Sequence, residues 1–120
     1  MNRVEIKLQS ILNQESKRIS GKKLIYISHP YGGLEENKKK IEDIVIQLIY
    51  ENPQHTYISP VHTFGYTYND IDYETGLQYC LNLLDVCDEM LVYGDWQYSK
   101  GCKAEIRHAV DTNKEFKIMR

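Results

Sequence analysis

The sequence lacks the features that mark several large classes of protein. No apolar run approaches the roughly 20 residues that a membrane-spanning helix requires, and the first ten residues carry no signal-peptide core. The three cysteines, Cys80, Cys87 and Cys102, are odd in number and have no CxxC spacing. We therefore expect free thiols in a reducing cytoplasm, with neither a disulfide framework nor a cysteine metal site.

An excess of charge of either sign is also missing. Basic and acidic residues nearly balance, which leaves a net charge of −2 and a pI of about 6.1. A protein that binds nucleic-acid phosphates or an anionic membrane usually carries a clear positive excess. We therefore expect a partner that is neither nucleic acid nor membrane.

The residues that are present describe one globular domain over 1–120. They are 42% hydrophobic and 27% charged, which is typical of folded proteins and unlike disordered ones. A fold of this size buries roughly two thirds of the surface of the extended chain, so it needs no metal or disulfide. Tyrosine is unusually frequent, with 10 Tyr against 2 Phe and 1 Trp.

Helical and extended patterns alternate along the chain. An amphipathic helix is expected over about 1–20, with its apolar stripe at Val4, Leu8, Ile11, Leu12 and Ile19 and its end at Ser20-Gly21. Further helices are expected over 34–51, 77–87 and 100–110, the last with Ser99 as N-cap. Short strands are expected at 24–27, 56–58, 90–93 and 116–119. The segment 61–72 shows neither period and is expected to be a long functional loop or lid.

This alternation predicts an α/β layered fold with a mostly parallel sheet. Ligands of such sheets bind beyond the carboxyl ends of the strands. The loops that begin there start at Ser28, Ser59 and Gly94.

The most informative of these regions is Ser99-Lys100-Gly101-Cys102-Lys103-Ala104-Glu105. A helix that starts here offers backbone N–H groups to a phosphate or carboxylate. Glu105 lies four residues after Gly101 on the same face, so its carboxylate can face a ligand across a residue without a side chain. An acid in that position can attack an electrophilic carbon. The alternative is a solvated helix acid that faces Lys100 or Lys103.

The other loops carry weaker signals. Ser28-His29-Pro30-Tyr31-Gly32-Gly33 follows a strand and precedes a helix, and its backbone N–H groups can reach a phosphate, although it matches no established phosphate motif. It can equally be an ordinary turn. His62 is either a surface residue or a site residue, and no ligand set for a metal accompanies His29 and His62. Phe64, Tyr66, Tyr68 and Tyr73 either stack on a base or form a small core under the loop.

A resemblance adds to these patterns. The blocks IYISHPYGG at 25–33 and CDEMLVYG at 87–94, with Ser99-x-Gly101-x-x-x-Glu105, resemble the nucleoside 2-deoxyribosyltransferase superfamily over about residues 23–119. The similarity is strongest to its small bacterial and phage branch and to the 2′-deoxynucleoside 5′-monophosphate N-glycosidases. It implies a flavodoxin-like or Rossmann-like three-layer sandwich with four to five strands, to which residues 1–20 add a helix.

The resemblance also implies an activity without a cofactor: hydrolysis or transfer at the N-glycosidic bond of a (2′-deoxy)nucleoside or its 5′-monophosphate. Glu105 is then the catalytic nucleophile. The expected substrate contacts are Tyr26, Ser28, His29, Pro30, Tyr31, Gly32, Gly33, His62, Gly94, Asp95, Trp96, Ser99 and Gly101. Family members associate, so a homodimer or larger homo-oligomer is expected.

One departure from the family keeps a second function in view. Active relatives carry an acid, thought to protonate the leaving base, on the helix before the third strand. The nearest position here is Cys80, with Asn82 and Asp85 as neighbours, and Asp70, Asp72 or Glu74 are alternative donors. The alternative function is a catalytically inactive protein that binds a nucleotide in order to sense or sequester it.

Overall fold

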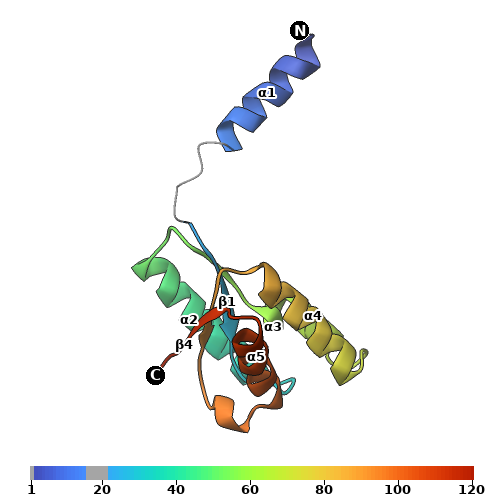
Figure 1. Cartoon of the computed structure of the whole chain (residues 1–120), viewed down its shortest axis with the longest axis vertical. Coiled ribbons are helices and arrows are strands. Elements are labelled where there is room, and N and C mark those ends of the chain that lie inside the picture. Colours follow the sequence, from blue (N-terminus) through green and yellow to red (C-terminus); the bar gives the residue numbers. More distant parts are fainter. Residues whose placement is uncertain (1, 16–21) are drawn as a thin grey trace.

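The computed structural model describes residues 2–15 and 22–120 and has the α/β architecture that the alternating patterns predict. Its helices and strands follow one another along the chain as shown in Figure 1. In order they are α1 (Arg3–Glu15), β1 (Leu24–Ser28), α2 (Glu35–Glu51), β2 (Thr56–Ile58), α3 (Pro60–Phe64), α4 (Tyr73–Val86), β3 (Glu89–Val92), α5 (Lys100–Asp111) and β4 (Glu115–Ile118), with short 3-10 helices η1 (Gly65–Thr67) and η2 (Trp96–Tyr98).

The four strands form one parallel sheet in the order β2-β1-β3-β4. Tyr26 in the central strand β1 pairs with Ile58 on one side and Met90 on the other. Because all strands run in the same direction, their carboxyl ends meet at one edge. The prediction of a mostly parallel flavodoxin-like or Rossmann-like sheet is confirmed.

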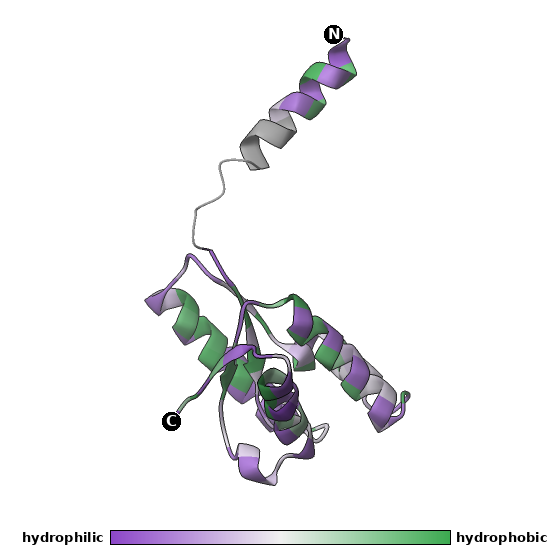
Figure 2. Ribbon diagram, viewed as in Figure 1, coloured by the Kyte–Doolittle hydropathy of each residue, from purple (hydrophilic) through white to green (hydrophobic). Residues whose placement is uncertain are grey.

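Alternate residues of β1 belong to two different cores. Ile25 and Ile27 pack with Ile41 of α2, whereas Tyr26 packs with Leu84 of α4 and with Ala109 of α5. Figures 1 and 2 show α2 on one side of the sheet and α4 with α5 on the other, with hydrophobic residues toward the strands. Since side chains alternate along a strand, Ser28 shares the face of Tyr26 and points toward α5.

The caps of two helices fix where the chain turns toward the carboxyl edge of the sheet. Ser99 caps α5 by accepting a hydrogen bond from the Cys102 backbone N–H at 3.1 Å, so the predicted cap is confirmed. Asp72 caps α4 by accepting from the Thr75 backbone N–H at 2.8 Å. Each such cap contributes about 1 kcal/mol.

The segment 61–72 differs from the expected long loop. It contains α3 and η1, which cross from β2 to the start of α4. The local reason is a good start signal: Ser59 accepts a hydrogen bond from the His62 backbone N–H, and Pro60 occupies the first helical turn. A helix of five residues is too short to show a 3.6-residue period, so α3 leaves no periodic signal in the sequence.

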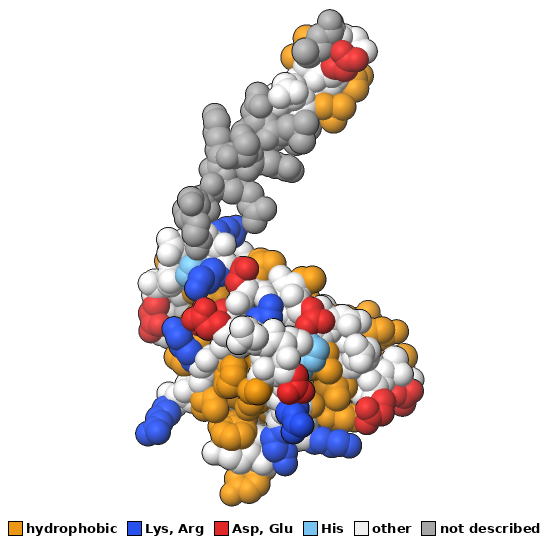
Figure 3. All heavy atoms as spheres, viewed as in Figure 1, with side chains coloured by type: hydrophobic (Ala, Val, Ile, Leu, Met, Phe, Trp, Pro, Cys, Tyr) orange, Lys and Arg blue, Asp and Glu red, His pale blue; other side chains and the backbone are white. Residues whose placement is uncertain are grey.

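The first helix is described over Arg3–Glu15. Its residues Val4, Ile6 and Leu8 are exposed, and Figure 3 shows apolar side chains on its surface. The predicted stripe residue Ile19 and the end at 20–21 lie outside the described residues, as do the side chains of Ile11 and Leu12. Among the described residues, no helix is long and apolar enough to cross a membrane.

Candidate functional site

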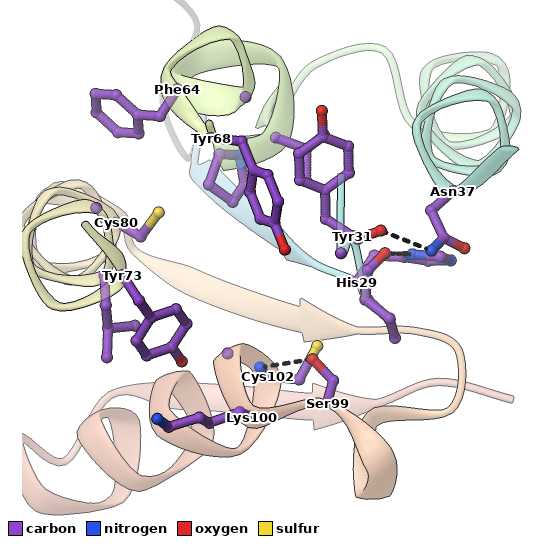
Figure 4. A pocket seen from close by; sticks show the side chains of 18 of the residues that line it. His29, Tyr31, Asn37, Phe64, Tyr68, Tyr73, Cys80, Ser99, Lys100 and Cys102 are labelled. Carbon is purple, nitrogen blue, oxygen red and sulfur yellow. Dashed lines mark hydrogen bonds between the residues drawn. The ribbon is translucent and has the colours of Figure 1, made fainter. Parts of the chain in front are cut away.

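A cavity of about 600 Å³ opens at the carboxyl ends of the strands, a size typical of small-molecule sites. Its walls come from the loop after β1, the start of α2, α3 and η1, and the N-terminal halves of α4 and α5. Figure 4 shows aromatic side chains from several of these elements converging on it. The cavity thus lies where a parallel sheet is expected to bind its ligand.

Glu105 contributes a buried carboxylate to this cavity. Its residue is only 6% exposed, and two hydroxyl groups of β1 hold its oxygens: Tyr26 donates to Oε2 and Ser28 donates to Oε1 at 2.9 Å. Both donors lie on the strand face that α5 covers. The alternative of a solvated helix acid is therefore excluded.

Burial changes the acid–base chemistry of this carboxyl group. Loss of water around the charged form raises the pKa of Glu105 to about 7, although the bonds from Tyr26 and Ser28 act in the opposite direction. The pKa of the Tyr26 phenol is raised well above its usual value by burial and by the nearby Glu105 charge. Glu105 therefore exists in both protonation states near neutral pH, with Tyr26 as a proton-retaining donor beneath it.

The start of α5 supplies the cavity with Ser99, Lys100, Gly101 and Cys102, and its second turn supplies Glu105. Gly101 leaves open space: a Cβ placed there would lie 4.0 Å from the hydroxyl oxygens of Ser99 and Tyr73. The ammonium group of Lys100 lies 4.5 Å from the centre of the Tyr73 ring. The carboxylate, the open glycine and a positive charge thus share one helix start.

The loop after β1 forms the wall opposite this helix start. His29, Pro30, Tyr31 and Gly32 line the cavity. The Nδ1–H of His29 donates to the Pro30 carbonyl oxygen at 2.7 Å, and the Asn37 amide donates to the Tyr31 carbonyl oxygen at 2.9 Å. These two bonds hold the loop against the start of α2.

Aromatic residues of α3, of the position that follows η1 and of α4 complete the enclosure. Phe64, Tyr68 and Tyr73 line the cavity, whereas Tyr66 is 83% exposed. The Tyr68 and Tyr31 rings meet edge to face, with centroids 5.3 Å apart and planes at 75°. Figure 4 shows these two rings on the side of the cavity opposite Ser99 and Lys100.

Several expected substrate contacts lie elsewhere. His62 lines a second cavity of about 530 Å³ beside α2 and β2, together with Ser59 and Glu42. Gly94 packs against His29 and Pro30. The remaining five do not line the cavity either: Trp96 packs against the core, Asp95 is exposed, Gly33 lies under Tyr68, and Tyr26 and Ser28 are wholly buried and reach the site only through their hydrogen bonds to Glu105.

The acid–base groups near Glu105 are unlike those of a metal centre. Among residues 2–15 and 22–120, no three His, Cys, Asp or Glu side chains are grouped to hold a metal ion. Cys80 and Asp72 line the cavity, while Asp70 and Glu74 are exposed. Burial and the Glu105 charge raise the pKa of the Cys80 thiol to about 11, so this thiol keeps its proton at neutral pH.

Comparison with known proteins places the chain in a family. A family model described as a domain of unknown function, DUF7768, matches residues 23–119. The chain belongs to this family. The DUF7768 match spans the whole sheet and every element that lines the cavity, and it leaves α1 outside. No curated protein matches the sequence.

Within the DUF7768 domain, the cavity also contains residues that the sequence patterns did not single out as contacts. Asn37, Asp72, Cys80, Lys100 and Tyr98 all line it. Lys100 was visible beside Ser99 and Gly101 but was interpreted only as a possible partner of Glu105. Asp72 and Cys80 are expected only as candidates for the proton donor, and Asn37 gives no signal, because its place at the start of α2 is what brings it to the sheet edge.

Proposed function

We propose that this protein cleaves the N-glycosidic bond of a (2′-deoxy)nucleoside or its 5′-monophosphate, with Glu105 as the nucleophile. The observation that carries this proposal is the Glu105 carboxylate itself. It is buried in a cavity of nucleotide size and faces it across the open Gly101, and hydroxyl groups of Tyr26 and Ser28 fix its direction. The resemblance of residues 23–119 to the nucleoside 2-deoxyribosyltransferases supports the same assignment.

The proposed reaction has two steps. A carboxylate oxygen of Glu105 forms a bond to C1′ while the bond from C1′ to the base breaks, and the electron pair leaves on the base nitrogen, which takes up a proton. Water, or a second base, then attacks C1′ and loses a proton to solvent, while the bond from C1′ to Glu105 breaks and its electron pair returns to the carboxylate. The Tyr26 and Ser28 donors hold the carboxylate in place, and only its ionised form is a nucleophile.

The start of α5 is suited to a 5′-phosphate. Ser99 supplies a hydroxyl group, the helix start supplies N–H groups with a favourable dipole, and Lys100 supplies a full positive charge. Each lies on the same helix turn as the bare Gly101. A monophosphate bound here would bring its sugar toward Glu105, which lies one turn further along the same face.

A second function, nucleotide binding without turnover, is favoured by one specific observation. Cys80 stands on α4, where active relatives carry the acid that protonates the leaving base, and its thiol holds its proton too tightly to be a strong acid. A protein of this kind would bind the nucleotide as a signal or reserve. The cavity itself fits both functions.

Base release separates the two functions. The protein is incubated with the common deoxynucleosides and their 5′-monophosphates, and free base is followed by chromatography. Release that disappears in Glu105→Ala supports the enzyme. Tight binding of a monophosphate without release of base supports the binding protein, and neither binding nor release contradicts both.

We also propose that the protein forms a homodimer or a larger homo-oligomer in a reducing cytoplasm. Exposed Val4, Ile6 and Leu8 on α1 and the three free cysteines support this proposal. Sedimentation at micromolar concentration should give at least twice the mass of one chain. A mass of one chain would contradict it.

A further inference from the structure

The helix α1 carries an apolar stripe that is exposed to solvent. Val4 and Leu8 are both more than half exposed. Because residues four apart on a helix share a face, these two side chains form one continuous stripe, while Ile6 lies on the opposite side of the helix. Figure 1 shows α1 apart from the sheet and the helices that cover it. Val4 and Leu8, the α1 stripe, are thus open to a partner.

A second exposed apolar surface lies on α2. Ile46, Ile49 and Tyr50 are three and four residues apart, so they share the outer face of this helix. They are 51%, 47% and 83% exposed, whereas the inner face of α2 packs on the sheet. Ile46 also lines the second cavity, together with Tyr57 and Ile58 of β2. The outer face of α2 and this cavity form one apolar surface, the α2 groove, of the kind that marks an interaction site.

The α1 stripe and the α2 groove match in length. Val4 to Leu8 and Ile46 to Tyr50 each span four residues, which is about 6 Å of helix. An amphipathic helix that lays its apolar face into a groove is a common mode of recognition, and its anchors follow this spacing. The stripe can therefore lie along the groove with both of its side chains in contact.

The charges beside the two surfaces are opposite. Residues 41–51 of α2 carry three acidic side chains and no basic one: Glu42, Asp43 and Glu51. Glu42 and Asp43 remain exposed to solvent beside their pairs with His62 and Lys39. Residues 2–10 carry Arg3 and Lys7 against Glu5 alone, and Arg3 and Lys7 share one side of α1. Such complementary charge favours the encounter of two surfaces and sets their orientation.

Contact between two copies buries both surfaces at once. In a reciprocal exchange, α1 of each copy lies in the α2 groove of the other, so one two-fold axis relates two identical contacts. Within one chain both surfaces are exposed. The DUF7768 match begins at residue 23, so the element that joins the copies is an addition to the domain.

We propose that α1 of one copy binds in the α2 groove of a second copy, with Val4 and Leu8 against Ile46 and Tyr50. The exchange is reciprocal and gives a dimer. This inference rests on the proposed homo-oligomer and deepens it by naming the two surfaces that meet. It makes the second cavity part of a protein interface, separate from the reaction at Glu105.

The test measures the dissociation constant of the dimer by sedimentation equilibrium of the full chain. The wild type should have twice the mass of one chain at micromolar concentration. Leu8→Glu on α1 and Ile46→Glu on α2 should each raise the constant by at least about 30-fold, the scale of an interface hot spot. Both positions are exposed and glutamate is a good helix former. Circular dichroism of each variant checks that the helices are retained.

Two exposed apolar positions away from the proposed contact provide matched controls. Ile6 lies on the side of α1 opposite the stripe, and Val110 lies on α5. Ile6→Glu and Val110→Glu introduce the same charge at similarly exposed sites, so both should leave the constant nearly unchanged. A loss of dimer in Ile6→Glu equal to that in Leu8→Glu would overturn the inference, because the contact would not depend on the stripe.

Mixing the two interface variants tests whether the two surfaces bind each other. A heterodimer of Leu8→Glu with Ile46→Glu keeps one intact contact, between the unaltered α1 of the second variant and the unaltered groove of the first. The mixture should therefore contain more dimer than either variant alone at the same total concentration. Absence of this recovery would overturn the inference.

The outcomes separate the inference from the other proposals. A monomeric wild type, whose α1 would bind its own chain or another protein, overturns both the inference and the homo-oligomer. A dimer that only one of Leu8→Glu and Ile46→Glu disrupts shows that like surfaces pair, and a dimer that neither disrupts uses another surface. Both results overturn the inference and leave the homo-oligomer standing. Base release by the wild type is measured separately, so its absence contradicts the proposed reaction alone.

Discussion

Two cavities of this protein each contain a glutamate bound to neighbouring side chains, and the two glutamates differ in almost every other respect. Glu105 is buried and bound by two hydroxyl groups of β1. Glu42 is bound by His62 Nε2 at 2.8 Å, with Ser59 on the other ring nitrogen at 2.8 Å, and its side chain is 40% exposed. The residue types at the second cavity, Ser59, His62 and Glu42, resemble a catalytic triad more than the residues around Glu105 do.

Solvent is what separates the two carboxyl groups. The hydrogen bond from His62 lowers the pKa of Glu42, which water reaches, whereas burial raises the pKa of Glu105 to about 7. A carboxylate that has lost its water and faces a cavity is a stronger nucleophile than one that is stabilised by solvent and a histidine. The comparison therefore indicates that the cavity of Glu105 is the reactive one, although the residues of the other cavity look more like a catalytic triad.

The largest expected effect is on the rate of base release, and it is expected for removal of the Glu105 carboxylate but not of the Glu42 carboxylate. Glu105→Gln should reduce base release by at least about a thousandfold, because an amide is a poor nucleophile for C1′. Glu42→Gln should leave the rate within about twofold. Rates are measured by chromatography of free base at a saturating monophosphate concentration. Equal loss in both variants would remove the distinction between the cavities.

The second effect is on the free energy of unfolding and follows from the upward shift of the Glu105 pKa. The folded protein keeps the Glu105 proton up to about pH 7, while the unfolded chain loses it near its ordinary value. Stability should therefore fall as the pH rises through this window, by about 3 kcal/mol in total. Glu105→Gln lacks this loss, so in urea unfolding its stability should exceed that of the wild type by much more at pH 8 than at pH 5.

The stability of Glu42→Gln should depend on pH differently from that of Glu105→Gln. The pKa of Glu42 is lowered, so its contribution is lost as the pH falls and is present at pH 8. Glu42→Gln should therefore gain nothing relative to the wild type between pH 5 and pH 8. A gain as large as that of Glu105→Gln would show that burial of Glu105 is not its source.

The third effect concerns the donor beneath Glu105. Tyr26 donates to the charged form of the carboxyl group and thereby lowers its pKa. Tyr26→Phe should move the rise of base release with pH upward by about one to two pH units, the scale of one hydrogen bond to a charged group. The pH profile of kcat is the measurement. His62→Gln, which removes the partner of Glu42, should leave that profile in place.

The smallest effect concerns phosphate recognition. Ser99→Ala should weaken binding of a 5′-monophosphate by about 1–2 kcal/mol and leave the nucleoside nearly unchanged. Gly101→Val should weaken both, because it fills the approach to Glu105. Ser59→Ala removes the equivalent cap at the second cavity and should change neither affinity in calorimetry. Equal weakening of nucleoside and monophosphate by Ser99→Ala would move the phosphate elsewhere.

How far the sequence predicts the structure can be seen by comparing α5 with α3. The helix α5 shows a cap at Ser99, an apolar stripe and a glycine four residues before Glu105, so both its start and the face of its acid could be predicted. The helix α3 has only five residues, too few for a period, so the pattern of the aromatic cover that it begins predicts a loop. Local signals thus located the acid but not the enclosure.

Local sequence patterns also do not predict the burial and the hydrogen-bond partners of Glu105. Tyr26 and Ser28 are 79 and 77 residues away in the chain, and only the packing of α5 on β1 brings their hydroxyl groups to the carboxylate. The same packing decides its burial and its pKa. His62 shows the opposite case, since its residue type indicated a site, yet α3 directs it toward α2 and away from Glu105.

The most direct test of the central claim is to trap the bond that Glu105 is proposed to form. A 2′-deoxy-2′-fluoro-arabinonucleoside 5′-monophosphate slows both steps, because fluorine destabilises positive charge near C1′, and the second step is expected to slow enough for the ester to accumulate. Intact mass of the acid-quenched protein should rise by the mass of the sugar phosphate, and digestion should place the adduct on Glu105. An adduct on another residue, or an unchanged mass while free base is released, would contradict the account.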